Sequence, residues 1–476
     1  MIRKRITISF CALMLCLGHL LPGYAQSNAQ FDVVLAERLQ NALMSEYSRQ
    51  ELKGISAAVF VPAQGMWRGV AGIAGEGALD LVTDSTHFAV ASITKTFTGA
   101  IILQLAEEGR LSLDDSLHQW LEPYQYINLD ITLRQLLGHT SGLYNITDNP
   151  EFWTAFWADP ARNWTPEEIL TQFMMRPVLQ PGRAFDYSNS NYHLLGMVAK
   201  AATDSSMVAL LRSRLYNPQL LQHSFFTPEE PVVGVLSDNW TDADRDGQFE
   251  NVASKSGAAY YTMSWAAGGM TATAADMASW AQALFAGNVL QEDTRGEMLE
   301  FTPLSNGTAF TGYGLSIMRF EFDGVEMWGH TGLKPGFISM LVYVPETGVS
   351  ICVLINQDNA ASTYAVVPRL YDAIANPVST GADDLIEQEA VFALYQNYPN
   401  PVFGSTSIVF ELASSADVEL DVYDVLGRRI ESLVHGYYTA GKHSIDWQPD
   451  ERTGGLYFYR LKANGYSATR SLVYMK

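Results

Sequence analysis

Cysteine is scarce in this chain, and the shortage excludes a disulfide framework. The 476 residues include 3 cysteines, and Cys11 and Cys16 lie in an apolar stretch near the N-terminus. If export removes that stretch, Cys352 stays alone and no intramolecular disulfide can form. Cys352 lies in the apolar run 349–355 without a nearby His or Asp pattern, so we expect a buried strand residue rather than a nucleophile.

Basic residues are in deficit as well. Lys and Arg number 30 against 51 Asp and Glu, which gives a formal net charge of −21. Nucleic acid is therefore excluded as a partner, because its phosphates are held by Lys and Arg. A hydrophobic content of 47% with 17% charged residues is typical of a globular protein, and the length suits two domains.

The apolar stretch 6–21 is short for a membrane span, and His19 interrupts it. It follows a basic start (Met1-Ile2-Arg3-Lys4-Arg5) and precedes the small-residue site Gly23-Tyr24-Ala25. We therefore predict a signal peptide, residues 1–25, and no stable transmembrane segment after processing. A retained membrane anchor is the alternative.

Hydrophobic periodicity predicts an α+β domain over 26–376. Its expected elements are helices over 31–50, 92–108 and 364–375 and strands over 55–61, 66–73, 324–328, 337–344 and 349–356. Strands from both ends of this region bracket a helical insert, so we expect an antiparallel sheet flanked by helices, plus a helical subdomain.

A linker over 377–390 and a second, all-β domain over 391–476 follow. Short apolar runs at regular spacing, separated by turn residues, predict a small β-sandwich. The expected strands are 407–412, 418–423, 429–434, 443–447, 456–461 and 468–475. A carbohydrate-binding or adhesive sandwich fits the same pattern.

Ser92-Ile93-Thr94-Lys95 is the first motif that carries chemistry. Ser92 is expected at a helix start, where backbone N–H groups and the positive end of the helix dipole converge. Lys95 comes one turn later among apolar neighbours, and desolvation there disfavours its charged form. It could then accept the serine proton. Taken alone, the pair also fits a capping serine and a solvated lysine.

Tyr187-Ser188-Asn189 is the second motif, and it precedes an expected helix. A nearby lysine ammonium would favour the phenolate of Tyr187, which suits a general base. Three other Tyr-x-Asn matches, at 126–128, 395–397 and 398–400, lack such a setting. A packed loop tyrosine is the alternative for Tyr187.

His330-Thr331-Gly332 is the third motif, placed after a strand that is expected to end near Gly329. Gly332 would let the backbone approach a ligand, and the strand edge could offer an N–H to an oxyanion together with the N–H of Ser92. A hairpin with an incidental histidine is the alternative. We interpret the similar run 139–142, His-Thr-Ser-Gly, as a structural turn.

The three motifs, in this order, resemble those of the serine β-lactamase and penicillin-binding protein superfamily, most closely its class C β-lactamase and D-alanyl-D-alanine carboxypeptidase branch. Further segments of the resemblance are Phe88-Ala89-Val90-Ala91, Leu136-Leu137-Gly138-His139-Thr140-Ser141-Gly142-Leu143 and Ala267-Gly268-Gly269-Met270. It covers about 31–375. It implies a β-lactamase-like fold, with no cofactor, and an acyl-enzyme on Ser92 formed from D-amino-acid peptides, β-lactams or small esters.

The resemblance also implies roles for the other residues. Lys95 and Tyr187 would share the proton transfers, and Asn189 would bind the substrate amide beside Thr331 and Gly332. His330 stands where class C enzymes carry Lys, facing the substrate carboxylate or activating Tyr187 electrostatically. The N–H groups of Ser92 and Leu333 would form the oxyanion hole. A non-catalytic surface protein that binds peptidoglycan fragments is the alternative function.

Runs in the second domain resemble the type IX secretion sorting domain. They are Tyr395-Gln396-Asn397-Tyr398-Pro399-Asn400-Pro401, Val422-Tyr423-Asp424-Val425-Leu426-Gly427-Arg428, Ala440-Gly441-Lys442-His443 and Gly455-Leu456-Tyr457-Phe458-Tyr459-Arg460. The resemblance implies export by the type IX machinery and a secreted or cell-surface location.

Asp242, Asp244 and Asp246 match the start of a calcium-binding loop. Position twelve is Ala253 where the usual bidentate Glu is required, so a polar hairpin tip is the favoured interpretation and no metal site is assigned.

Overall fold

The computed structural model describes residues 31–77, 80–242, 247–304, 308–358, 362–376, 392–395, 397, 402, 404–424, 427–449 and 454–474. The expected signal peptide and linker lie outside these residues. Among the described residues no single helix is long and apolar enough to cross a membrane, and one bent helix pair, 189–203 with 207–216, passes by length and composition.

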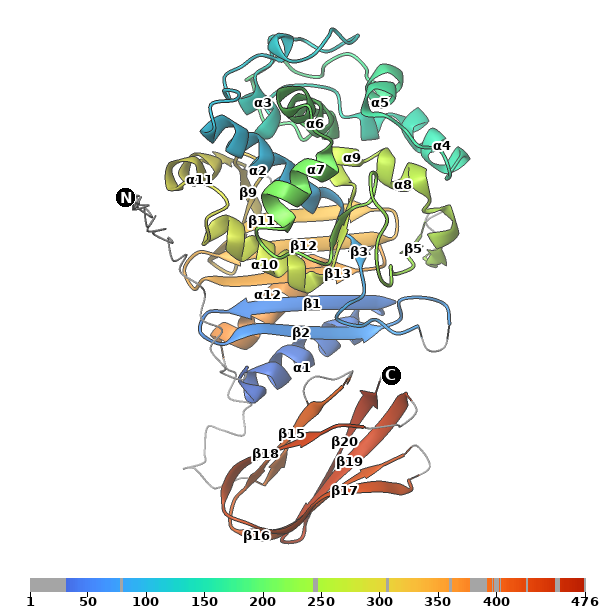
Figure 1. Ribbon diagram of the computed structural model, residues 1–476, viewed down its shortest axis with the longest axis vertical. Coiled ribbons are helices and arrows are strands. Elements are labelled where there is room, and N and C mark those ends of the chain that lie inside the picture. The colour runs from blue at the N-terminus through green and yellow to red at the C-terminus, as the bar shows by residue number, and fades with distance from the viewer. Residues whose placement is uncertain are drawn as a thin grey trace, which may run out of the picture.

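An eight-stranded antiparallel sheet forms the centre of the larger domain, in the order β2-β1-β13-β12-β11-β10-β9-β8 (Figure 1). The strands are β1 (Gly54–Val61), β2 (Gly65–Gly72), β8 (Thr302–Pro303), β9 (Phe310–Tyr313), β10 (Met318–Phe322), β11 (Val325–Lys334), β12 (Phe337–Val344) and β13 (Val349–Ile355). Every residue of β12 and β13 is buried, Cys352 included, because helices cover both sheet faces. The α+β prediction is confirmed.

The first and last helices of this domain pack together on one face of the sheet. They are α1 (Val33–Arg49) and α12 (Ser362–Ala375), which contains Pro368. Asp32 caps α1, since its carboxylate accepts the N–H of Leu35 at 2.7 Å. Leu35, Leu39 and Leu43 fall on the buried side of α1 at helical spacing.

Helices cover the opposite face and build the helical subdomain (Figure 1). They are α2 (Thr94–Glu107), α3 (Leu133–Leu137), α4 (Pro150–Ala158), α5 (Pro166–Phe173), α6 (Asn189–Thr203), α7 (Met207–Leu211), α8 (Ala258–Thr262), α9 (Trp265–Gly268), α10 (Ala274–Phe285) and α11 (Glu292–Met298). A three-stranded sheet joins β3 (Phe88–Ala89), β7 (Met270–Ala272) and β4 (Ser224–Phe226), and β5 (Trp240–Thr241) pairs with β6 (Glu250–Asn251). A single large core links these helices to the sheet.

The end of β11 differs from the prediction at a position that matters for the site. β11 continues through His330-Thr331-Gly332 to Lys334, whereas the sequence pattern placed its end near Gly329. β12 pairs with β11 as far as Lys334, but β10 pairs only over 325–329. The motif is therefore the last part of a strand whose β10 side has no strand partner in the described chain.

The C-terminal module consists of two small antiparallel sheets around one core. The first contains β14 (Ala393–Leu394), β15 (Thr406–Leu412) and β18 (Gly441–Trp447), and the second contains β16 (Ala416–Tyr423), β17 (Arg429–Tyr438), β19 (Gly455–Ala463) and β20 (Tyr466–Tyr474). All six predicted strands are present. The module lies beside α1 and β2, far from α4 and α6 (Figure 1).

Candidate active site

Ser92 is presented at a sharp turn between β3 and α2. Ala91, just before it, has φ 47°, which is left-handed and unusual for a residue with a Cβ. Residues Ala91–Ile93 form one turn of 3₁₀ helix, and α2 continues from Thr94. Ala91 and Ile93 are buried, while Ser92 is partly exposed. The hydroxyl is therefore accessible on a rigid backbone.

Gly332 brings β11 against the segment that carries Ser92. A Cβ atom at 332 would lie 2.3 Å from the carbonyl oxygen of Val90 and 3.0 Å from the Cβ of Ala91. The hydroxyl of Ser339 on β12 also donates to Val90 O at 2.8 Å. Gly332 thus allows a close approach to the nucleophile segment, and the predicted approach of its backbone to a ligand stays a prediction.

Lys95 is fully buried, and its ammonium nitrogen contacts three oxygens. Nζ lies 3.0 Å from Ser92 Oγ, 2.8 Å from Asn189 Oδ1 and 2.7 Å from the carbonyl oxygen of Ala267. Burial holds the pKa of Lys95 well below its usual value, as the sequence predicted. The structure thus places an amine with a lowered pKa beside the serine hydroxyl.

Asn189 opens α6, and neighbouring side chains fix the orientation of its amide. Nδ2 donates to Asn145 Oδ1 at 3.2 Å and to Thr147 Oγ1 at 3.1 Å, so Oδ1 faces Lys95. Both ends of the amide are engaged within the protein. Asn189 is therefore joined to the Lys95 cluster, and its predicted contact with a substrate amide stays a prediction.

Tyr187 reaches the same cluster. Its hydroxyl shares a hydrogen bond with Ser92, and Lys95 Nζ lies 5.1 Å from the centre of its ring. The structure corrects the expected protonation state, because burial raises the pKa of Tyr187 although the Ser92 hydrogen bond opposes the rise. Tyr187 is a neutral phenol here, whereas the sequence argument favoured the phenolate.

His330 is buried, with its ring centre 6.2 Å from that of Tyr187. Its Nε2 lies 3.2 Å from the hydroxyl of Tyr313, and its Nδ1 lies 2.6 Å from the carbonyl oxygen of Thr331. Burial lowers the pKa of His330 to about 3. An uncharged imidazole does not activate Tyr187 electrostatically, so that expectation is corrected, while the expected position of His330 facing a substrate carboxylate stays a prediction.

A hollow of about 630 Å³ opens over these residues. Its walls include the predicted site residues Ser92, Tyr187, Asn189, His330, Thr331 and Leu333. A narrower hollow of about 70 Å³ adjoins it, where Ser92 and Asn189 meet Phe152, Trp153 and Phe156 of α4. Trp153 and Phe156 are thus candidate substrate contacts, while Trp164 is buried against Phe173.

Sequence reasoning missed two residues of this region. His139, interpreted as part of a structural turn, has φ 53° and does form one, but its Nδ1 also accepts the N–H of Ser188 at 3.1 Å. Lys334 lines both hollows and is buried. Alternation along β11 places 330, 332 and 334 on one buried face, and this period-two signal could have identified Lys334.

The candidate calcium loop lies mostly outside the described residues, since only Asp242 of its three aspartates is placed. Over the described ranges, no group of three His, Cys, Asp or Glu side chains could hold a metal ion.

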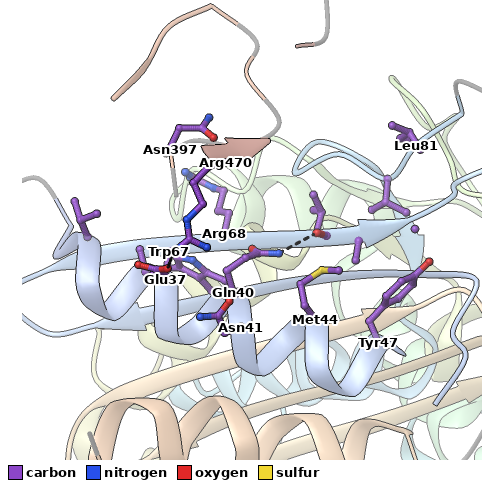
Figure 2. Close-up of a pocket in the computed structure, with 16 residues that line it drawn as sticks. Glu37, Gln40, Asn41, Met44, Tyr47, Trp67, Arg68, Leu81, Asn397 and Arg470 are labelled. Atoms are coloured by element: carbon purple, nitrogen blue, oxygen red, sulfur yellow. Dashed lines mark hydrogen bonds and ion pairs between the residues drawn. The ribbon is translucent and has the colours of Figure 1, made fainter. Parts of the chain in front are cut away.

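A third hollow, of about 350 Å³, lies between α1, β2 and the C-terminal module (Figure 2). Arg470 of β20 reaches Glu37 of α1 there, with Nη2 3.2 Å from Oε1, and Gln40 and Arg68 line the same space. The described residues that line it include no Ser, Thr, Cys or His.

Two family models match this chain, and the first covers the region that contains Ser92. Residues 36–376 match the family model described as Beta-lactamase, and residues 396–475 match the model described as Secretion system C-terminal sorting domain. Penicillin-binding protein 4 of Amycolatopsis lactamdurans is 25% identical over 348 residues, which are 68% of this chain and 85% of that protein.

Several solved structures are similar to this chain. Among them, a D-stereospecific amidohydrolase from Streptomyces sp. is 27% identical with a TM-score of 0.61, over 71% of this chain and 98% of that one. The D-amino acid amidase from Ochrobactrum anthropi SV3, complexed with L-phenylalanine amide, is 24% identical with a TM-score of 0.65, over 72% of this chain and 99% of that one. At 24% identity, the similarity to the D-amino acid amidase shows a shared fold only.

Proposed function

Since the chain belongs to the beta-lactamase family and ends in a type IX sorting domain, we propose that it is an exported serine hydrolase that forms an acyl-enzyme on Ser92. Amides and peptides of D-amino acids are the proposed substrates, with β-lactams and small esters as further acyl donors. The likeness to a D-stereospecific amidohydrolase supports this choice of substrate.

The contacts of Lys95 carry the proposal. Asn189 Oδ1 and the carbonyl oxygen of Ala267 are pure acceptors, so they take two N–H bonds of Nζ. A neutral amine has two N–H bonds and one lone pair, and the third partner is the hydroxyl of Ser92. With the pKa lowered by burial, the lone pair faces the proton that must leave Ser92.

The remaining steps follow from these positions. Ser92 Oγ attacks the substrate carbonyl carbon while Lys95 takes its proton, and the N–H groups of Ser92 and Leu333 are the proposed oxyanion donors. When the C–N bond breaks, the proton on Lys95 passes through the neutral phenol of Tyr187 to the leaving amine. Water then attacks the ester by the reverse sequence of proton transfers and frees Ser92.

We also propose the division into a signal peptide (1–25), a catalytic domain (26–376), a linker (377–390) and a sorting domain (391–476). The sorting domain supports delivery to the cell surface or the medium by the type IX machinery. Removal of the first segment is a proposal from sequence alone.

Intact-mass spectrometry tests the proposed acyl-enzyme. Purified protein should gain one adduct from benzylpenicillin or a fluorophosphonate, Ser92→Ala should gain none, and the exposed-serine control Ser213→Ala should match the wild type. Turnover of D- and L-phenylalanine amides then measures stereospecificity. Labelling that persists in Ser92→Ala refutes the proposal. Ligand binding without any adduct in the wild type favours the non-catalytic peptidoglycan-binding alternative.

A further inference from the structure

Lys334 is a buried lysine beside the nucleophile that the proposed chemistry does not use. It ends β11, four residues beyond His330, and its side chain is 6% exposed. Nζ donates to Ser264 Oγ at 2.7 Å and is 3.4 Å from the carbonyl oxygen of Gly268. Burial lowers the pKa of Lys334, so in the free protein the amine is neutral, its two N–H bonds point to these two oxygens, and its lone pair has no partner among the described residues.

No carboxylate among the described residues pairs with Lys334, and burial is the cause of its lowered pKa. Instead, the rings of Tyr260 and Tyr261 face it, with centroids 4.2 Å and 4.8 Å from Nζ. Burial raises the pKa of both phenols, so neither supplies a negative charge. Asp358 lines the wider hollow, but its carboxylate accepts from Thr241 and from the N–H of Gly336.

The surroundings of Lys334 form a small side-chain pocket. Ser264 and Gly268, its two hydrogen-bond partners, line the 70 Å³ hollow with it, and Phe152, Trp153 and Phe156 make the hollow's aromatic wall. Ser92 and Asn189 line the same space. This volume admits a group of a few heavy atoms. Apolar walls with one amine that lacks a counter-charge suit a short aliphatic chain that ends in an anion, because an anion beside it favours the protonated lysine.

We propose that Lys334 determines substrate specificity by binding a carboxylate at the end of the acyl side chain, an inference that rests on the proposed acyl-enzyme at Ser92. The preferred substrates are then amides whose acyl group is a short acidic residue, such as D-glutamate. A carboxylate would supply the missing counter-charge, so that Lys334 takes up a proton and donates the new N–H bond to it, while Trp153 and Phe156 cover the methylene groups.

The test uses a matched substrate pair, the α-amides of D-glutamate and D-glutamine, which differ by a carboxylate against a carboxamide of the same size. The wild type should have a kcat/KM about 10- to 100-fold higher for the glutamate amide, as expected for a hydrogen bond to a charged group. Lys334→Met should remove this preference by lowering kcat/KM for the glutamate amide, while kcat/KM for the glutamine amide stays within threefold of the wild-type value. Lys255→Met, at an exposed lysine, should keep it.

Equal kcat/KM values for the two amides in the wild type refute the inference. The inference is also refuted if Lys334→Met lowers kcat/KM for both amides by the same factor, because that result assigns Lys334 a structural role. If Lys334→Met fails to fold, Lys334→Gln keeps a donor without the charge and should show the same loss of preference.

A binding measurement separates this inference from the acyl-enzyme proposal. In a Ser92→Ala background no acyl transfer is needed, and calorimetry should show about 10- to 100-fold tighter binding of the glutamate amide, lost on adding Lys334→Met. Selective binding without any adduct in the wild type would refute the acyl-enzyme and support the Lys334 site. An adduct in the wild type without selective binding would support the acyl-enzyme and refute the Lys334 site.

Discussion

The imidazole of His139 lies against the phenol ring of Tyr187, with ring centroids 4.2 Å apart. The same imidazole accepts the N–H of Ser188 through Nδ1, so one buried side chain holds two consecutive residues of the Tyr187-Ser188-Asn189 motif. Burial keeps the pKa of His139 well below its usual value, and the ring is therefore a neutral acceptor. His139 is a positioning residue for the motif.

Replacing His139 tests this role. His139→Ala should destabilise the fold by about 2–4 kcal/mol through the cavity and the unpaired N–H of Ser188. It should also lower kcat more than it raises KM, because Tyr187 loses its support. His139→Asn restores an acceptor near the position of Nδ1 and should recover most of kcat. Urea unfolding measures the loss of stability, and steady-state kinetics measures kcat and KM. If His139→Asn has a kcat as low as that of His139→Ala, the positioning role is contradicted.

Lys95 sets the acid limb of the pH–rate profile. Activity requires its neutral amine, which is populated above the pKa in the folded protein, so activity should fall as pH drops through that lowered pKa. The plateau should therefore extend to far lower pH than an ordinary lysine allows. Lys95→Met should lower kcat/KM by about 10²- to 10⁴-fold. Rates that rise only near pH 10 in the wild type would contradict this assignment.

The same lowered pKa predicts how stability depends on pH. Between the folded-state pKa and the ordinary lysine value, the unfolded chain binds a proton that the folded chain does not. The free energy of unfolding should therefore rise with pH across this window, and Lys95→Met should make the slope shallower. Urea midpoints at several pH values measure it. An unchanged slope would show that Lys95 is protonated in the fold.

Tyr187→Phe distinguishes a neutral phenol from a phenolate base. Because burial raises the pKa of Tyr187, the phenol passes protons but does not set the acid limb. The variant should lose about 10²- to 10⁴-fold in kcat and keep the pH at which activity falls. A shifted acid limb in Tyr187→Phe would restore the phenolate hypothesis.

Gly332→Ala should separate β11 from the nucleophile segment. The new Cβ would be 2.3 Å from Val90 O, so the fold should lose about 1–3 kcal/mol and acylation by benzylpenicillin should slow. Gly296→Ala is the matched control, because it lies in α11 with nothing within 4 Å of the new Cβ. The control should be stabilised by about 0.5–1 kcal/mol. Equal acylation rates in both variants would contradict the proposed contact.

The elements were predictable where local patterns suffice. Short apolar runs bounded by turn residues identified β12, β13 and the C-terminal strands, and the three motifs identified the residues that meet at Ser92. The end of β11 was missed because two glycines, at 329 and 332, weaken a strand pattern that pairing with β12 then sustains.

Properties that depend on burial were not predictable. The sequence argument weighed only the charge of Lys95 on Tyr187, but desolvation is the larger effect, and it arises from side chains distant in sequence. Lys334 was missed for a related reason, since its partners Ser264 and Gly268 belong to a segment about seventy residues earlier. Only folding brings them together.

The sorting module lies at the end of the molecule opposite α4 and α6, the two helices that help to line the narrow hollow at Ser92 (Figure 1). β1 pairs with β13 and α1 packs on α12, so both ends of the catalytic region meet on the sheet face turned away from α4 and α6, next to the module (Figure 1). Attachment to an outer surface through this module would therefore place α4 and α6 on the side of the molecule away from that surface.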